Sequence, residues 1–161
     1  MLLSGIVWPR WPYEVLQHAL GGDLQLVLSS TVIEEARRKF SEKFPAYMQD
    51  LEDFLGECVY EEAPEPSPEE ILTHRDLMRD ITDIPIALAA INAGVDYLVS
   101  EDKDFTARNE TTAKLHEQLK VLLSGTFLRQ VMGWTSKELE EIRHREWSDV
   151  GEGLILDRST V

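Results

Sequence analysis

Cysteine is almost absent from this chain of 161 residues, in which Cys58 is the only one. A lone cysteine excludes an internal disulfide and a cysteine-rich metal site, and it fits a reducing cytosol. Cys58 is therefore expected to be a buried, inert thiol. With 43% hydrophobic residues, a single domain spanning 1–161 can bury roughly 70% of the surface that its unfolded chain exposes. We expect such a core to need no crosslink.

Long apolar runs are lacking as well. None approaches the roughly 18 residues that a membrane-spanning helix needs, and Met1 is followed by neither a basic region nor a signal-like apolar core. We therefore expect a soluble, cytoplasmic protein without a membrane partner. No glycine-rich phosphate loop follows any expected strand, which argues against a Rossmann-like nucleotide binder.

Positive charge is scarce, because 16 Lys and Arg stand against 30 Asp and Glu, for a net charge of −14. Sequence-independent affinity for nucleic acid comes from Lys and Arg that neutralise phosphate, so the composition argues against a passive nucleic-acid coat. Clustered carboxylates can instead hold divalent cations, which then face the phosphate. An enzyme that acts on nucleic acid is compatible with this charge.

Apolar segments alternate with helix boundary signals along the chain. Helices are expected at 8–22, 31–43, 46–55, 71–79, 84–93, 125–131 and 136–147, and strands at 24–28, 58–60, 96–100 and 120–123. Strands that are apolar throughout and alternate with helices predict a parallel central sheet covered on both faces, a three-layer α/β/α fold.

Local signals refine this pattern. The spacing of Thr31 and Glu34 predicts a capping box for one helix. The last helix is expected to be capped by Thr135, which has the same spacing to Glu138, or by Ser136. Asp83 is expected as the N-cap of helix 84–93, whose first turn holds a proline. The stretch 61–70, rich in proline and glutamate, predicts an exposed loop.

Acidic residues follow several of the expected strands. In parallel α/β sheets, ligands bind at the carboxyl ends of the strands, where loops and helix starts converge. The acidic residues placed there by chain order are Glu35, Asp102, Asp104 and Asp157. Asp83, at the start of the helix before strand 96–100, belongs by the same reasoning to the opposite edge unless the start of that helix faces the site. Each acid also has an ordinary interpretation, as a helix cap, a turn residue or part of a solvated helix face.

Two stretches, 26–35 and 80–105, resemble the PIN domain, a family of metal-dependent ribonucleases that includes many toxin components. The first matches the family's strand, serine and helical glutamate, and the second matches its third acid, apolar helix and strand leading to the fourth acid. Weaker similarity extends through 121–128. The resemblance implies that Glu35, Asp83 and Asp102 are site acids, with Asp104 as an accessory one, and it brings Asp83 into the site. Choosing Glu35 over Glu34 rests on its distance from Ser29.

The chain departs from the family at its start. A PIN domain opens with a central strand that ends in an aspartate, whereas this sequence begins at the helix that follows. Residues 153–161 contain the missing pattern, with Asp157 as the acid. In one account the domain is circularly permuted and 153–161 supply the central strand, either within one chain or by exchange between two subunits. In the other account the frame is truncated and the match is chance. We favour permutation, because a parallel sheet without its central strand leaves ladder hydrogen bonds unpaired.

The resemblance implies an endoribonuclease that uses Mg²⁺ or Mn²⁺, the hard cations that carboxylates prefer. The implied catalytic residues are Glu35, Asp83, Asp102 and Asp157, and the implied metal ligands are these four together with Asp104. RNA is the implied substrate, an antitoxin and a second copy of the chain are the implied partners, and candidate RNA contacts are Arg37, Arg38, Lys39, Lys103 and Arg108. The alternative from another class is a catalytically inactive PIN-like binding or assembly module.

Overall fold

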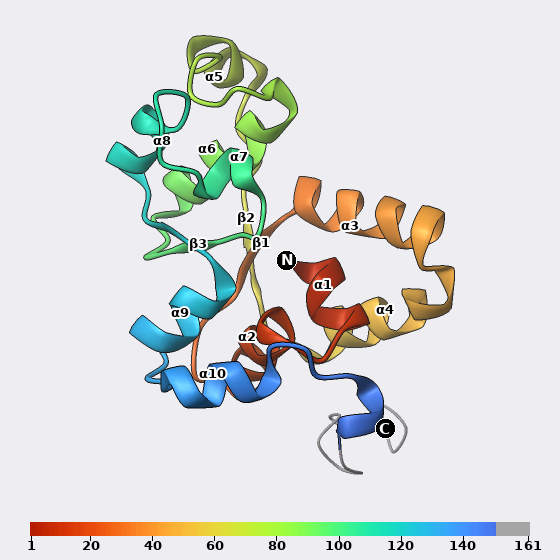
Figure 1. Cartoon of the computed structure of the whole chain (residues 1–161). Coiled ribbons are helices and arrows are strands. Elements are labelled where there is room, and N and C mark those ends of the chain that lie inside the picture. Colours follow the sequence, from red (N-terminus) through yellow and green to blue (C-terminus); the bar gives the residue numbers. More distant parts are fainter. Residues whose placement is uncertain (151–161) are drawn as a thin grey trace. The chain divides into compact units, whose positions relative to one another are not determined.

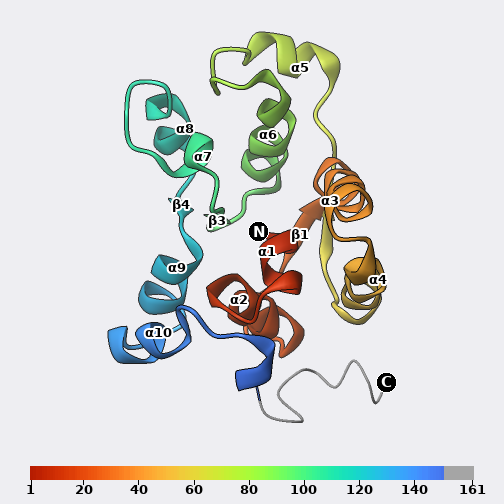
Figure 2. The same cartoon turned by 45° about the vertical axis from the view of Figure 1, so that its right-hand side comes forward.

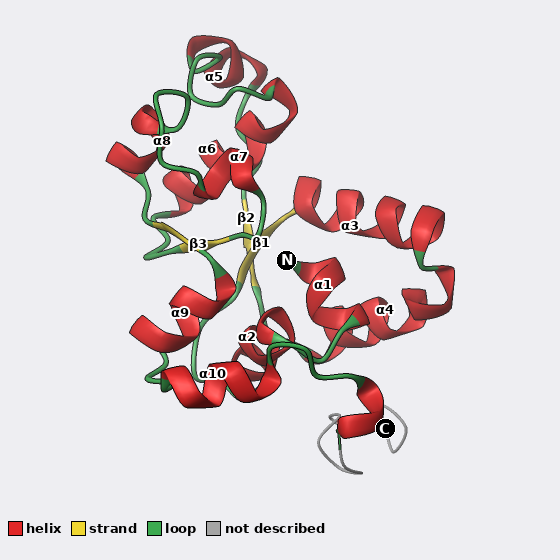
Figure 3. Cartoon of the chain, viewed as in Figure 1, coloured by secondary structure: helices red, strands yellow, loops and turns green. Residues whose placement is uncertain are grey.

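The computed structural model describes residues 1–150, which group into two compact units (Figure 1). One unit holds 1–26, 36–60 and the described residues from 124 onward, and the other holds 27–35 and 61–123. Helix α3 (Ser30–Lys43) begins in the second unit and continues into the first. Helices dominate and the strands are short (Figure 3). No helix in the described part is long and apolar enough to cross a membrane.

The first unit is helical. Its elements are α1 (Leu2–Val7), α2 (Trp11–Leu20), η1 (Pro45–Tyr47), α4 (Met48–Glu57), α9 (Ser124–Gln130), α10 (Ser136–Ile142) and η3 (Trp147–Asp149). Helix α2 packs against α1 and α9. A Cβ on Gly125 of α9 would lie 2.7 Å from a ring atom of Trp11, so only glycine permits this close approach. Thr135 and Glu138 form the expected capping box at the start of α10.

The second unit contains all the described strands, arranged in two parallel pairs. Strand β1 (Val27–Ser29) pairs with β2 (Glu61–Ala63), and Val27 lies opposite Glu61. Strand β3 (Leu98–Val99) pairs with β4 (Val121–Leu122), and the two lie side by side in Figure 2. The chain is therefore a mixed α/β protein with short parallel strands, and within 1–150 the strands form two small sheets rather than one.

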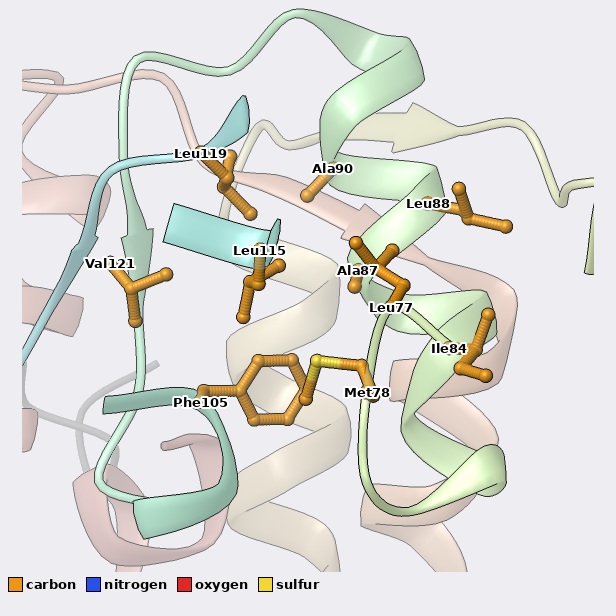
Figure 4. Close-up of a cluster of buried hydrophobic side chains, with 10 residues drawn as sticks. All are labelled: Leu77, Met78, Ile84, Ala87, Leu88, Ala90, Phe105, Leu115, Leu119 and Val121. Carbon is orange, nitrogen blue, oxygen red and sulfur yellow. The ribbon is translucent and has the colours of Figure 1, made fainter. Parts of the chain in front are cut away.

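The core of the second unit is built around α6. Its helices are α5 (Pro68–Thr73), η2 (Ile81–Asp83), α6 (Ile84–Ala93), α7 (Lys103–Thr106) and α8 (Ala113–Gln118). Pro85 lies in the first turn of α6, and Gly94 ends the helix in a left-handed conformation at φ 67°. Figure 4 shows the side chains of Phe105, Leu115 and Met78 pointing toward one another within the buried cluster.

The stretch 61–70 is mostly exposed as expected, but only 64–67 is a loop, and the edge strand expected at 58–60 lies at 61–63 instead. Strand β2 begins at Glu61, which lies opposite Val27 of β1. This register buries Ala63 to 3% exposure, whereas Val59, before the strand, is 85% exposed. Ser67 and Glu70 then form a capping box that starts α5. The proline-rich segment therefore supplies a strand and a helix start.

Other boundaries also differ from the expectations. Helix α5 ends at Thr73, well before the expected residue 79. The cap of α3 is Ser29, whose Oγ accepts a hydrogen bond from the Val32 N–H at 3.2 Å, so the predicted capping box of Thr31 and Glu34 is wrong. The predicted central strand at 153–161, together with Asp157, lies outside the described residues.

Candidate functional site

The site acids nearest a strand lie just after β3. Ser100 Oγ accepts a hydrogen bond from the Asp102 N–H at 3.0 Å, and Asp102 Oδ1 accepts one from the Asp104 N–H at 2.9 Å. Asp102 thus caps the short helix α7, on which Asp104 occupies the first turn. This chain of local hydrogen bonds fixes both residues at the carboxyl end of β3.

Asp80 and Asp83 bracket the turn η2 that leads into α6. Asp80 Oδ1 accepts hydrogen bonds from the N–H and the Oγ1 hydroxyl of Thr82, at 3.0 and 2.7 Å. Asp83 occupies the N-cap position of α6, but its side chain makes no capping hydrogen bond. A cap alone therefore does not account for this aspartate.

Three carboxylates converge in the second unit. Oxygen atoms of Asp80, Asp83 and Asp104 all lie within 4.8 Å of one another. Asp83 is half-buried and Asp80 is exposed. Chain order placed Asp83 at the opposite edge unless the start of its helix faced the site, and that exception applies, because the η2 turn brings its carboxylate beside Asp104. The resemblance groups Asp83 with Asp104, and these two carboxylates lie close together.

The electrostatics of Asp83 reflect this crowding. Burial, and then the negative charges of four neighbours, together raise the pKa of Asp83 from its ordinary 3.8 to about 6. These neighbours are Asp80, Asp102, Asp104 and Glu35. The resemblance singled out Glu35 rather than Glu34, and Glu35 is the one whose charge acts on Asp83; Glu34 is exposed.

Arg79 is a cation in contact with these acids. Its Nη2 donates a hydrogen bond to Asp104 Oδ1 at 2.7 Å, and its side chain is 69% exposed. The pKa of Asp80 is lowered chiefly by hydrogen bonds from Thr82, and the charge of Arg79 adds to this effect. Asp104 is only 24% exposed, so solvent reaches this ion pair mainly at the guanidinium.

A separate carboxylate is bound at the start of α3. Glu65 accepts hydrogen bonds from the Ser30 hydroxyl at 2.8 Å, the Thr31 N–H at 2.9 Å and the Thr31 hydroxyl at 2.8 Å. Partial burial alone would raise the pKa of Glu65, but the hydrogen bonds from Thr31 and Ser30 lower it below its ordinary value. Glu65 is thereby engaged within the fold and is not a member of the acidic cluster.

Of the basic residues expected to contact RNA, some are paired with carboxylates and others are exposed. Two predicted RNA contacts are paired with carboxylates, Arg37 with Glu52 at 2.7 Å and Arg38 with Glu42 at 3.7 Å. His116 Nε2 lies 2.7 Å from the Phe105 carbonyl oxygen, and Lys103 and Arg108 are exposed. His116 is thereby engaged by the backbone of α7.

The structure thus brings together Asp83 and Asp104, with Asp102 and Glu35 within electrostatic reach, while Asp157 lies outside the described residues. Sequence reasoning missed Asp80 and Arg79. The spacing of Asp80 and Asp83 across a single turn was the available signal for Asp80, because it places two carboxylates at one helix start.

The donor set fits a hard divalent cation. Carboxylate oxygens are the ligands that Mg²⁺ and Mn²⁺ prefer, and a cation relieves the repulsion among like charges that raises the pKa of Asp83. Comparisons with known proteins found no family, no characterised protein and no solved structure that matches the chain. The case for a function therefore depends on the residues themselves.

Proposed function

We propose that this protein is a metal-dependent endoribonuclease of the PIN type. The observation that carries the proposal is the convergence of Asp80, Asp83 and Asp104 within 4.8 Å, together with the charges of Asp102 and Glu35 that act on Asp83. Carboxylates held this close are typical of cation sites, because they repel one another in the absence of a cation.

The acidic residues would have distinct roles in the proposed enzyme. Asp83, Asp102 and Asp104 would hold Mg²⁺ or Mn²⁺, joined by Asp157 and Glu35, and Asp80 is a further ligand by its position. The bound cation would lower the pKa of a coordinated water and neutralise charge on a phosphodiester. Glu35 and Asp83 could instead orient the attacking water as bases, if the other carboxylates hold the cation.

We also propose that the two sheets are parts of one central sheet with a strand between β1 and β3. Within the described residues, β1 pairs only with β2 and β3 pairs only with β4. Helix α6 contacts β1 and β2, and its buried residues cluster with Leu98 and Val121 of the other sheet. Both pairs therefore pack on one helix, as the halves of one covered sheet would.

Residues 154–156, an apolar Leu-Ile-Leu run followed by Asp157, are our proposed occupant of that place. A strand there would satisfy the ladder groups of β1 and β3 and complete a three-layer α/β/α fold. If it ran parallel to β3, Asp157 would follow its carboxyl end, as Asp102 follows β3. The antitoxin and the homodimer implied by the resemblance stay predictions.

The ribonuclease is tested by cleavage of a fluorescent RNA with and without Mn²⁺. We expect Mn²⁺-dependent cleavage that falls about 100-fold or more in Asp102→Asn and Asp157→Asn, because each removes a charged oxygen from the cation site. Asp96→Asn is the matched control, since Asp96 is exposed and stands outside the cluster. Cleavage without Mn²⁺, or unchanged in both variants, contradicts the proposal. A folded protein with no response to Mn²⁺ supports the inactive binding module instead.

The proposed strand is tested by amide hydrogen exchange. We expect the amides of 154–156 to exchange slowly, with protection similar to that of Leu98 and Ser100, whose N–H groups bond to β4 carbonyl oxygens or their neighbours. Exchange at the rate of an unstructured peptide would reject 154–156 as the occupant. The measurement needs neither metal nor RNA, so it tests the fold separately from the activity.

A further inference from the structure

Arg79 is held beside the acidic cluster by its backbone, while its side chain is largely exposed. The two residues before it, Leu77 and Met78, are buried to 2% and 4% exposure in the core around α6. The residue after it is Asp80, a member of the cluster. The Arg79 side chain itself is 69% exposed and contacts Asp104. The backbone therefore fixes Arg79 beside the cluster, and its largely exposed guanidinium contacts the cluster through Asp104.

A cation on Asp104 competes with any other cation for the same carboxylate. Arg79 Nη2 donates to Asp104 Oδ1 at 2.7 Å, so an ion ligated by this oxygen competes with the guanidinium for it. The displaced guanidinium presents five N–H donors in a planar fork that matches two phosphate oxygens, a geometry that lysine cannot reproduce. In a chain with a net charge of −14, such a group next to the cluster is well placed to bind a polyanion.

We propose that Arg79 is a phosphate-binding residue for RNA that is held on Asp104 until the acidic cluster ligates a divalent cation. The inference rests on the proposed ribonuclease function. It adds an order of events, since Arg79 becomes available to the substrate only when the site is loaded. It also gives the side chain two opposed effects, because Arg79 weakens cation binding and strengthens RNA binding.

The opposed effects separate this role from a structural one. If Arg79 only stabilised the start of α7 through Asp104, its removal would weaken cation binding and RNA binding together or change neither. If it acts as proposed, its removal strengthens one and weakens the other. Arg75→Gln is a matched control, since Arg75 carries the same charge and lies four residues earlier. Its side chain is exposed and makes no hydrogen bond or ion pair within the described part of the chain.

The experiment measures Mn²⁺ affinity by calorimetry and steady-state RNA cleavage in wild type, Arg79→Gln, Arg79→Lys and Arg75→Gln. For Arg79→Gln we expect the Kd for Mn²⁺ to fall about three- to tenfold, equivalent to about 0.7–1.4 kcal/mol. The KM for RNA should rise about tenfold, with a smaller change in kcat, because a charged contact to the bound substrate is lost. Arg79→Lys should keep part of the RNA affinity, since it retains the charge without the fork.

Each result bears on one proposal or on both. If Arg79→Gln matches Arg75→Gln in Mn²⁺ affinity or in KM, the role of Arg79 is rejected while the ribonuclease stands. If wild type binds no Mn²⁺, the ribonuclease and the role of Arg79 are both rejected. Circular dichroism and urea unfolding of each variant show that the differences do not come from loss of the fold.

Discussion

The two compact units arrange charge in contrasting ways. In the helical unit Arg145 donates to Glu14 at 2.7 Å and to the Pro9 carbonyl oxygen at 2.6 Å, with the ion-pair side chains 16% and 17% exposed. Its guanidinium also lies 5.7 Å from the centre of the Tyr13 ring. In the other unit Asp80, Asp83 and Asp104 crowd together with Arg79 at their edge. Matched charges stabilise the first arrangement, whereas like charges oppose folding in the second and are typical of a ligand site.

The same contrast holds between two helix starts. Thr135 caps α10 by accepting a hydrogen bond from the Glu138 N–H at 3.1 Å, and Glu138 accepts one from the Thr135 N–H at 3.1 Å. Asp83 occupies the equivalent position of α6 without capping it. Since aspartate is among the best capping residues, a non-capping aspartate that also faces other carboxylates does not serve the stability of its own helix.

The largest effect on stability is expected from Arg145→Ala. The substitution leaves Glu14 partly buried without its cation and removes the hydrogen bond to the Pro9 carbonyl, so the free energy of unfolding should fall by about 3 kcal/mol. Urea unfolding followed by circular dichroism measures this change. Arg143→Ala is the control, because Arg143 and Glu140 are 55% and 70% exposed, and such pairs contribute less than about 1 kcal/mol.

A loss below about 1 kcal/mol in Arg145→Ala would contradict this account, because the charges of the helical unit would then contribute no more than an exposed pair. If stability falls as expected, the folded variant should still respond to Mn²⁺. Arg145 lies in a different unit from the acidic cluster, so its loss should change stability and leave the site intact.

Elements with local signals were predictable from the sequence. Helix α6 agrees with the expected 84–93, because Pro85 fixes its start and Gly94 fixes its end within a few residues of chain. The capping box of Thr135 was predicted for the same reason. The alternation of apolar strands and helices also gave the mixed α/β class and the parallel pairing. These features depend on contacts that are close in sequence or on composition alone.

Features that depend on distant partners were not predictable. The prediction of an exposed loop failed at β2 because the partner of that strand, β1, lies more than thirty residues away. The N–H and hydroxyl of Thr31 donate to Glu65, so the capping-box spacing of Thr31 and Glu34 was misleading. Arg79 was overlooked for the same reason, since its partner Asp104 lies 25 residues further along the chain, after β3.

The smallest predicted effect is a pH-dependent gain of stability in Asp83→Asn. Burial, and then the charges of Asp80, Asp102, Asp104 and Glu35, raise the pKa of Asp83 from 3.8 to about 6, so the folded state binds this proton more tightly than the unfolded state. The stabilisation by that proton is complete below pH 3.8 and is lost as the pH rises through about 6. Asparagine is neutral throughout, so the metal-free variant should melt about 3 °C above wild type at pH values well above 6 and converge with it below pH 4. Saturating Mn²⁺ should close the gap by stabilising wild type, while Asp96→Asn should show no difference at either pH. If Asp83→Asn gains no more than Asp96→Asn, the crowded carboxylates cost the fold nothing, and the two units do not differ as argued.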